Sequence, residues 1–270
     1  MIMKSRQAQE LDESNRQAIG AWKQFAEGAP NGVCPETTGV VCAFSNVPMP
    51  FFNMAFLSSP VANLSELNDR MAAIKELASS CRSSWMFFSC DQWLPEELRA
   101  AQDQVFTPHD LHSTMHLTGM VTDLNSLSAT AANPPLEYRR VAGRETSFAI
   151  SDLNCAAYGV PFEIGRESIL ESMFGAEVFA YVGYLKDQPV SAAGVWIVDD
   201  SLYVAMVATH PDHRRKGYAD AVMRHSLQEA QKATGITRTV LHATEAGLPV
   251  YERMGYRFIA RFTLYSLPDE

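Results

Sequence analysis

A basic turn directly before an amphipathic helix is the feature of this sequence best suited to chemistry. Arg214, Arg215 and Lys216 precede Gly217, and the residues that follow have the apolar periodicity of a long helix. The first amide groups of a helix lack intrahelical partners, and the aligned peptide dipoles place roughly half a positive charge at that end. A phosphate group suits both properties. The stretch therefore predicts a binding site for a phosphorylated ligand.

Small residues in this turn have a steric purpose. Gly217 lets the backbone approach a bulky anion, and Ala219 keeps the next turn clear. The spacing differs from the Gly-x-x-x-x-Gly-Lys-Ser/Thr of a P-loop and from the Gly-x-Gly-x-x-Gly of a dinucleotide site. From this motif alone, a basic helix start exposed to solvent is an alternative interpretation.

The surrounding pattern predicts a sheet that positions the turn. An antiparallel meander of three strands is expected over residues 177–211 and leads into a helix over 214–234. A strand over 237–244, a helix over 246–255 and a final strand over 256–267 complete the chain. The elements expected before the meander are a strand over 137–143 and helices over 146–159 and 166–175.

The first half has a similar order of elements. Residues 35–123 predict β-β-α-β-α-β after a helix over 6–28, and Ser65 is expected to cap the first helix of this order. Small polar residues and a double proline predict a linker over 124–137, which divides the chain into domains 1–130 and 131–270. The expected strands cover 39–45, 51–58, 83–90 and 113–123, and the expected helices cover 65–81 and 94–106.

Composition limits the classes of function. Of the 270 residues, 47% are hydrophobic, which is typical of a globular protein. The formal net charge of −9 is unfavourable for general nucleic-acid binding. Five cysteines without a C-x-x-C pair predict free thiols in a reducing compartment. No signal peptide or membrane span is recognisable, so we expect a cytoplasmic protein without a membrane partner. We expect no metal site, because His109, His112 and His116 would not share a face of the predicted strand.

Two motifs of the second half resemble those of the GNAT superfamily, the GCN-related N-acetyltransferases. Residues 214–219 match the family pattern Arg/Gln-x-x-Gly-x-Gly/Ala, and they follow Thr209-His210-Pro211. The second motif is VLHATEAGLPVYERMGY, in which Tyr251 precedes a Gly-Tyr pair. The resemblance covers residues 138–266. It implies an α/β fold of two tandem GNAT-like halves, each with a mixed central sheet flanked by helices. The first half lacks the basic motif and would be a degenerate copy.

The resemblance implies that acetyl-CoA binds between the strands over 202–209 and 239–243, which would splay apart. Backbone amides of the basic turn would hold the pyrophosphate, and the first strand would pair with the pantetheine arm. Thr244 occupies a position where many relatives have an asparagine, so an asparagine contact is not expected. The implied cofactor-binding residues are Val207, Ala208, Thr209, Arg214, Arg215, Lys216, Gly217, Tyr218, Ala219, Thr244 and Tyr251.

The implied chemistry is attack of a neutral amine on the acetyl thioester. An alkylamine of pKa ~10 is only about 0.1% neutral at pH 7, so a proton must be removed. Glu163 and His242 are the candidate bases, although a solvated acid, a structural histidine or ordered water would be compatible with the sequence. By resemblance, a backbone amide of residues 206–208 stabilises the oxyanion, and Tyr251 protonates the CoA thiolate; packing of Tyr251 is the alternative.

By resemblance, the first half contributes to the acceptor pocket. Asn53, Asp91 and Trp93 are the candidate substrate-binding residues, although Asn53 could satisfy a turn and Trp93 could belong to the core. The implied function is acetyl-CoA-dependent N-acetylation of a small-molecule amine, such as an amino acid, a polyamine or an amino sugar. A non-catalytic acyl-CoA-binding or sensing module and a protein N-acetyltransferase are alternatives.

Overall fold

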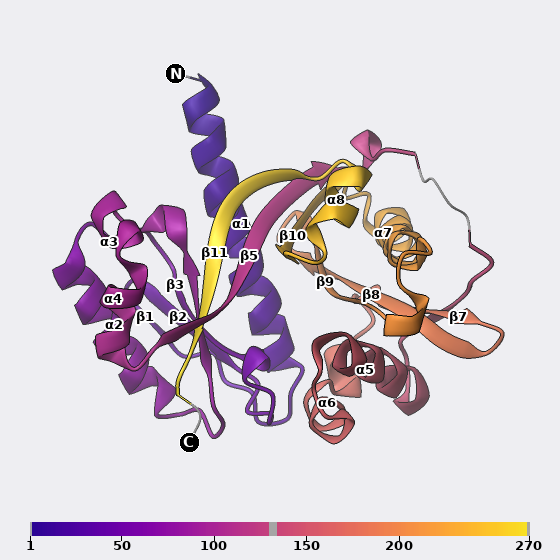
Figure 1. The fold of residues 1–270 in the computed structure, drawn as a ribbon, viewed down its shortest axis with the longest axis horizontal. Coiled ribbons are helices and arrows are strands. Elements are labelled where there is room, and N and C mark those ends of the chain that lie inside the picture. The colour runs from indigo at the N-terminus through magenta and orange to yellow at the C-terminus, as the bar shows by residue number, and fades with distance from the viewer. Residues whose placement is uncertain (1, 130–133, 269–270) are drawn as a thin grey trace. The chain divides into compact units, whose positions relative to one another are not determined.

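A computed structural model describes residues 2–129 and 134–268, with the side chains of residues 2–5 left out. The chain forms two compact units (Figure 1). The first comprises Met1–Met120, Ala243–Ala246 and Phe258–Glu270, and the second comprises Val121–His242 and Gly247–Arg257. The first unit thus includes the C-terminal strand, which a single boundary at residue 130 does not anticipate. Among the described residues, no helix is long and apolar enough to cross a membrane.

The first unit is a mixed sheet with its strands in the order β1-β2-β3-β4-β11-β5. Strands β3 and β4 are parallel, whereas β2 and β11 pair antiparallel with β3 and β4. Helices α1 and α2 pack on β2, and Trp22 of α1 lies among the rings of Phe25, Phe51 and Phe56. The elements are α1 (Ile2–Glu27), β1 (Glu36–Thr37), β2 (Val40–Phe44), β3 (Asn53–Leu57), α2 (Leu64–Ala78), β4 (Met86–Cys90), α3 (Glu96–Ala100), α4 (Gln102–Phe106), β5 (His112–Asp123) and β11 (Arg257–Ser266).

Two predictions for the first unit are wrong in detail. Helix α2 is capped by Asn63 and not by Ser65, because the Asn63 side chain accepts a 3.0 Å hydrogen bond from the Glu66 amide. The single helix expected over 94–106 is two short helices, because the backbone at Ala101 leaves the helical region with φ of −124°.

The second unit contains a sheet in the order β10-β9-β8-β7-β6. Strands β9 and β10 are parallel, and the remaining neighbours are antiparallel, so the predicted meander is confirmed. Helices α5 and α7 pack on β8 and β9, which lie between them in Figure 1. The elements are β6 (Glu137–Arg140), α5 (Arg144–Tyr158), α6 (Phe162–Ser168), β7 (Tyr181–Leu185), β8 (Gln188–Val198), β9 (Ser201–Thr209), α7 (Tyr218–Thr234), β10 (Arg238–Thr244) and α8 (Leu248–Met254).

The prediction of a helix over 166–175 is wrong in its bounds. Helix α6 begins earlier, after Pro161, and is followed by a 3₁₀ turn over Glu171–Met173. Gly165 allows α6 to lie directly on α5, since a Cβ atom there would be 2.0 Å from the Sγ of Cys155. This packing places α6 over residues that the sequence suggested were a loop.

The predicted linker contains local structure. Residues Leu124–Ser126 form a 3₁₀ turn, β6 begins at Glu137, and residues 130–133 of the predicted linker lie outside the described part of the chain. The end of β5 is held where the Leu124 amide donates to the Thr237 carbonyl at 2.8 Å and the Thr237 hydroxyl donates to Asp123 at 2.7 Å. Both units are mixed sheets with flanking helices, so the predicted fold class is confirmed.

Candidate active site

Strands β9 and β10 separate at the end that leads to the basic turn. Their pairing covers Leu202, Tyr203 and Val204 of β9, and β9 then continues to Thr209 without a partner residue in β10. The backbone of residues 205–209 therefore has one edge that β10 does not cover. An extended ligand can hydrogen-bond to such an edge in the manner of an added strand.

A β-bulge distorts β9 within this separated stretch. Ala192 of β8 pairs with Ala208, whereas Gly194 pairs with Ala205, so β9 has one extra residue between the two pairs. Met206 lies in the bulge with φ of 54°. Asn154 of α5 donates its side-chain amide to the Met206 carbonyl at 3.4 Å. Bulges re-aim backbone groups next to active sites, and α5 supports this one.

The basic turn connects β9 to α7 and leaves the start of that helix open. Gly217 is the N-cap residue with φ of 80° and ψ of 6°, and no side chain caps the helix. Arg215 also has a positive φ of 62°, a conformation that costs about 1–2 kcal/mol for a residue other than glycine. The amides of Tyr218 and Ala219 belong to the first turn, where they have no intrahelical acceptor. The turn thus presents backbone donors to an anion.

The turn also carries three cationic side chains. Arg214, Arg215 and Lys216 are all exposed. Lys216 donates to the Asp212 carbonyl at 3.1 Å, and Arg214 donates to the Ala157 carbonyl at 3.2 Å, so each of these side chains contacts a backbone carbonyl. The carboxylate in the first turn of α7, Asp220, is paired with Arg224 at 3.0 Å. Asp220 therefore does not neutralise the turn.

The corresponding turn of the first unit is closed by its own side chains. Before α2, Asn63 accepts from the Glu66 amide, and the Glu66 carboxylate accepts from the Ala62 amide at 2.7 Å. Arg70 pairs with Glu66 and donates to the carbonyl of Pro60 at 3.0 Å. These contacts occupy the start of α2, whereas the start of α7 has no side-chain cap.

Tyr251 lies on α8 with only 9% of its surface exposed. Burial raises the pKa of its phenol, and the nearby phenols of Tyr158 and Tyr256 raise it further. The Tyr256 hydroxyl lies 2.9 Å from the hydroxyl of Thr239, which fixes the turn after α8 onto β10. Tyr251 is therefore a protonated hydrogen-bond donor at neutral pH.

His242 lies on β10 with its Nδ1 atom 2.9 Å from the hydroxyl of Tyr203. Burial lowers the pKa of His242 to about 3 and raises the pKa of Tyr203. Both groups are neutral at pH 7, and an imidazole of such low pKa is a weak proton acceptor. The contact favours the structural interpretation of His242 over the catalytic one.

The remaining predicted residues of the second half have clear positions. Glu163 is exposed on α6. Thr209 ends β9, where its hydroxyl lies 2.8 Å from the Ser191 hydroxyl; Val207 and Ala208 precede it. Thr244 is the last residue of β10 and belongs to the first unit.

The three acceptor candidates of the first unit have largely structural contacts. Asn53 is completely buried; its side chain accepts from the Asn46 amide at 2.8 Å and donates to the Val47 carbonyl at 2.9 Å. Trp93 is 4% exposed and belongs to the core. Asp91 is half-buried and accepts a 3.1 Å hydrogen bond from the Thr263 hydroxyl.

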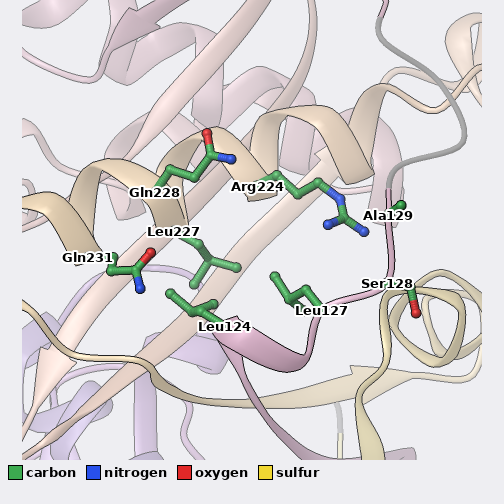
Figure 2. A pocket seen from close by; sticks show the side chains of 8 residues that line it. All are labelled: Leu124, Leu127, Ser128, Ala129, Arg224, Leu227, Gln228 and Gln231. Carbon is green, nitrogen blue, oxygen red and sulfur yellow. The ribbon is translucent and has the colours of Figure 1, made fainter.

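A pocket of about 240 Å³ lies elsewhere on the second unit (Figure 2). It is formed by the middle of α7 and the segment after β5, and it does not include the basic turn. Arg224 lines it but is already paired with Asp220. The pocket is lined by Leu124, Leu127, Ser128, Ala129, Arg224, Leu227, Gln228 and Gln231.

Three residues near the separated ends of β9 and β10 were not predicted from the sequence: Asn154, Tyr158 and Tyr203. Asn154 supports the bulge, Tyr203 contacts His242, and Tyr158 ends α5 with 52% of its surface exposed. An asparagine within an amphipathic helix was a usable signal for a buried polar contact. No local pattern indicates that Tyr158 is exposed or that Tyr203 reaches β10.

Comparison with known protein families and structures agrees with this geometry. Residues 185–259 match the family described as acetyltransferase (GNAT) domain. This segment begins in the meander and ends in β11, and it includes the basic turn and α8. Comparison with curated proteins finds no significant sequence match.

Solved structures show that the likeness of fold extends over both units. A GCN5-related N-acetyltransferase from Kribbella flavida has a TM-score of 0.70 and 18% identity, covering 95% of this chain and 96% of that one. A GCN5-related N-acetyltransferase from Sphaerobacter thermophilus has a TM-score of 0.57 and 12% identity, covering 86% and 78%. A tandem GNAT protein from the clavulanic acid biosynthesis pathway has a TM-score of 0.54 and 14% identity, covering 96% of each chain. We conclude that the chain has a GNAT fold and that its residues 185–259 are similar to a GNAT acetyltransferase domain.

Proposed function

We propose that the chain is an acetyl-CoA-dependent N-acetyltransferase that acetylates the amine of a small molecule by direct attack on the thioester. The observation that carries the proposal is the open start of α7 beside the separated strands β9 and β10. Backbone donors, exposed cations and an N-cap glycine with positive φ form a donor set that fits a diphosphate. Acetyl-CoA would supply the activated acetyl thioester.

The basic turn and β9 would bind two neighbouring parts of acetyl-CoA, the diphosphate and the pantetheine arm. The amides of Tyr218 and Ala219 would donate to the diphosphate, and Arg215 and Lys216 would add charge. The uncovered edge of residues 205–209 would hold the extended pantetheine arm through strand-like hydrogen bonds. Because α2 of the first unit is closed by its own side chains, we expect one such site in each chain.

Tyr251 would donate its proton to the departing sulfur. The phenol is protonated at neutral pH, so its proton is available, and because burial raises its pKa the transfer becomes favourable only as negative charge develops on the sulfur. The neutral amine nitrogen would bond to the acetyl carbon and give a tetrahedral oxyanion, and the nitrogen would lose its extra proton to water. Collapse of this species would form the neutral amide and break the carbon–sulfur bond while the sulfur takes the phenol proton. Solvent would then restore the proton to Tyr251.

The substrate amine would lose its proton before attack without a strong protein base. Glu163 is exposed to solvent on α6, and an imidazole with the His242 pKa of about 3 is a weak base, so neither residue is a suitable general base. Water would therefore carry the proton from the substrate ammonium. The consequence is a rate that follows the neutral fraction of the amine.

A CoA-release assay with a panel of amines, combined with acetyl-CoA titration, tests the function. Tyr251→Phe should lower kcat by on the order of 10²-fold, the range of general acid catalysis, while the Kd for acetyl-CoA stays unchanged. Tyr256→Phe serves as a control, because it removes the same phenol hydroxyl from the turn after α8, where that hydroxyl contacts the Thr239 hydroxyl at 2.9 Å. Binding without release for any small amine or lysine peptide would instead favour an acyl-CoA-sensing module, and release with peptides alone would favour a protein N-acetyltransferase.

A further inference from the structure

The pocket between α7 and the segment after β5 contains a guanidinium group that is only partly used (Figure 2). The side chain of Arg224 is 15% exposed, and both of its hydrogen bonds, to the two carboxylate oxygens of Asp220 at 3.0 Å, leave from the Nε atom. A buried guanidinium normally uses most of its N–H donors. Within the described part of the chain, the two Nη groups of Arg224 have no acceptor and are therefore available to a ligand.

One side of the pocket is apolar. Leu227 of α7 is 1% exposed, and Leu124 and Leu127 of the segment after β5 are half-buried beside it. Figure 2 shows these three leucines close together, with the guanidinium group of Arg224 at one end of the group and the amide of Gln231 at the other. A ligand in this pocket would thus contact apolar side chains along its length and a cation at one end.

Both walls of the pocket are held in place without a ligand. The Leu124 amide donates to the Thr237 carbonyl at 2.8 Å, and the Ser128 amide donates to the Met254 carbonyl at 2.9 Å. These bonds attach the segment after β5 to the chain before β10 and to the end of α8. The opposite wall is the regular helix α7. A pocket that is already formed requires little ordering of the protein when a ligand binds.

Charge, shape and volume select the ligand. Among the eight described residues that line the pocket, Arg224 is the only charged one, and Asp220 contacts it from outside this lining. The two Nη groups of a guanidinium present parallel N–H donors, a geometry that matches the two oxygens of one carboxylate. The volume of about 240 Å³ holds about eight non-hydrogen atoms at ~30 Å³ each, the size of hexanoate. One carboxylate on a short aliphatic chain therefore fits both ends of the pocket.

We propose that this pocket binds a monocarboxylate with a short aliphatic chain. The carboxylate would accept hydrogen bonds from both Nη groups of Arg224, and the chain would pack on the three leucines. Asp220 would keep the Nε group, so the guanidinium would lie between two carboxylates. The pocket includes neither the basic turn nor Tyr251. The inference therefore goes beyond the proposed acetyltransferase function and does not depend on it.

NMR titration of the ¹⁵N-labelled protein with three compounds tests the ligand class. Hexanoate has both parts, hexanamide has the chain without the charge, and acetate has the charge without the chain. We expect hexanoate to bind with a Kd of about 1 mM or below, and the other two compounds to bind at least about tenfold more weakly. The backbone amides of Leu127 and Gln228 should shift, and added acetyl-CoA should not displace hexanoate.

Variants of the charge and of the apolar side locate the ligand. Arg224→Gln should raise the hexanoate Kd by about tenfold or more, and Leu127→Asn should raise it by about threefold or more. Arg139→Gln is the matched control, because Arg139 is also an arginine of the second unit paired with carboxylates, and it does not line the pocket. Asp220→Asn should lower the Kd, because it removes the carboxylate that shares the guanidinium. Urea unfolding identifies any loss of folding, which cannot produce the tighter binding expected for Asp220→Asn.

Three outcomes would contradict the inference. Equal affinity for hexanoate and hexanamide would show that Arg224 does not hold a carboxylate. No binding of hexanoate at millimolar concentrations, or a Kd that Arg224→Gln and Leu127→Asn both leave at the wild-type value, would show that the pocket is not the site. Displacement of hexanoate by acetyl-CoA would place hexanoate in the acyl-donor site, which overturns this inference and leaves the proposed function standing.

Discussion

Replacing Gly217 tests the role of the basic turn against a control on the same helix. Gly217 and Gly235 lie at the two ends of α7 with φ of 80° and 76°. A Cβ atom at either position forces an L-residue into the left-handed region, which costs about 1–2 kcal/mol. Gly235→Ala meets no other steric barrier, because nothing lies within 4 Å of its added Cβ. Both variants should lose unfolding free energy through this backbone strain, and the measured stability of each is compared with its Kd.

Only Gly217→Ala should weaken acetyl-CoA binding. Relief of the strain at residue 217 rotates the amides that follow it, and hydrogen bonds to charged groups contribute about 1.5–3 kcal/mol each. Loss of one such bond corresponds to a rise in Kd of roughly tenfold to 150-fold. Isothermal titration gives the Kd, and urea unfolding gives the stability of each variant. A Gly217→Ala Kd within about twofold of the Gly235→Ala value would refute the assignment of the turn.

Three further predictions concern charge and protonation. Arg215→Gly keeps the positive φ of 62° but removes a cation, so it should raise the acetyl-CoA Kd severalfold in low salt and less in high salt. The logarithm of kcat/KM should rise with pH toward the amine pKa, without a step from His242, whose pKa is about 3. Because the unfolded chain protonates His242 first as pH falls, urea unfolding should show wild type losing more stability than His242→Gln from pH 6.5 toward 3.

The basic turn shows how much local chemistry can be predicted from a sequence. The α7 start needs a residue that accepts positive φ and has no side chain over the amides, and Gly217 meets both conditions locally. The meander was equally predictable, because Lys186, Asp187 and Asp199 mark its two tight turns, where each has a positive φ. In each case the signal and the structure it specifies lie within a few residues of each other.

The destination of the last strand could not be predicted in the same way. The pattern of residues 257–266 indicates a strand, but it does not reveal that Phe262 pairs with Cys90, which lies 172 positions earlier. Pairing of this kind depends on which edge is free in three dimensions, and alternation of apolar residues does not encode that. The boundary at residue 130 was predicted from linker composition alone. Composition does not indicate that β11 pairs with β4 of the first unit.

The protonation state of His242 and the burial of Asn53 could not be predicted from the sequence either. His242 is next to the expected cofactor strand, which made it a candidate base, but burial lowers its pKa to about 3. Asn53 is polar and lies on an expected strand, but its amide is used by the turn at Asn46 and Val47. In both residues the neighbours, and not the residue type, decide what the side chain can do.

Calorimetric titration with acetyl-CoA and with S-acetylpantetheine tests the central claim most directly. The two compounds share the acetyl thioester and the pantetheine arm, and only acetyl-CoA carries the diphosphate and the 3′-phosphoadenosine attached to it. If the start of α7 holds that diphosphate, acetyl-CoA should bind at one site in each chain and S-acetylpantetheine should bind at least about 100-fold more weakly, which corresponds to loss of one or two charged hydrogen bonds. Equal affinity for the two compounds, or no binding of acetyl-CoA, would contradict the claim.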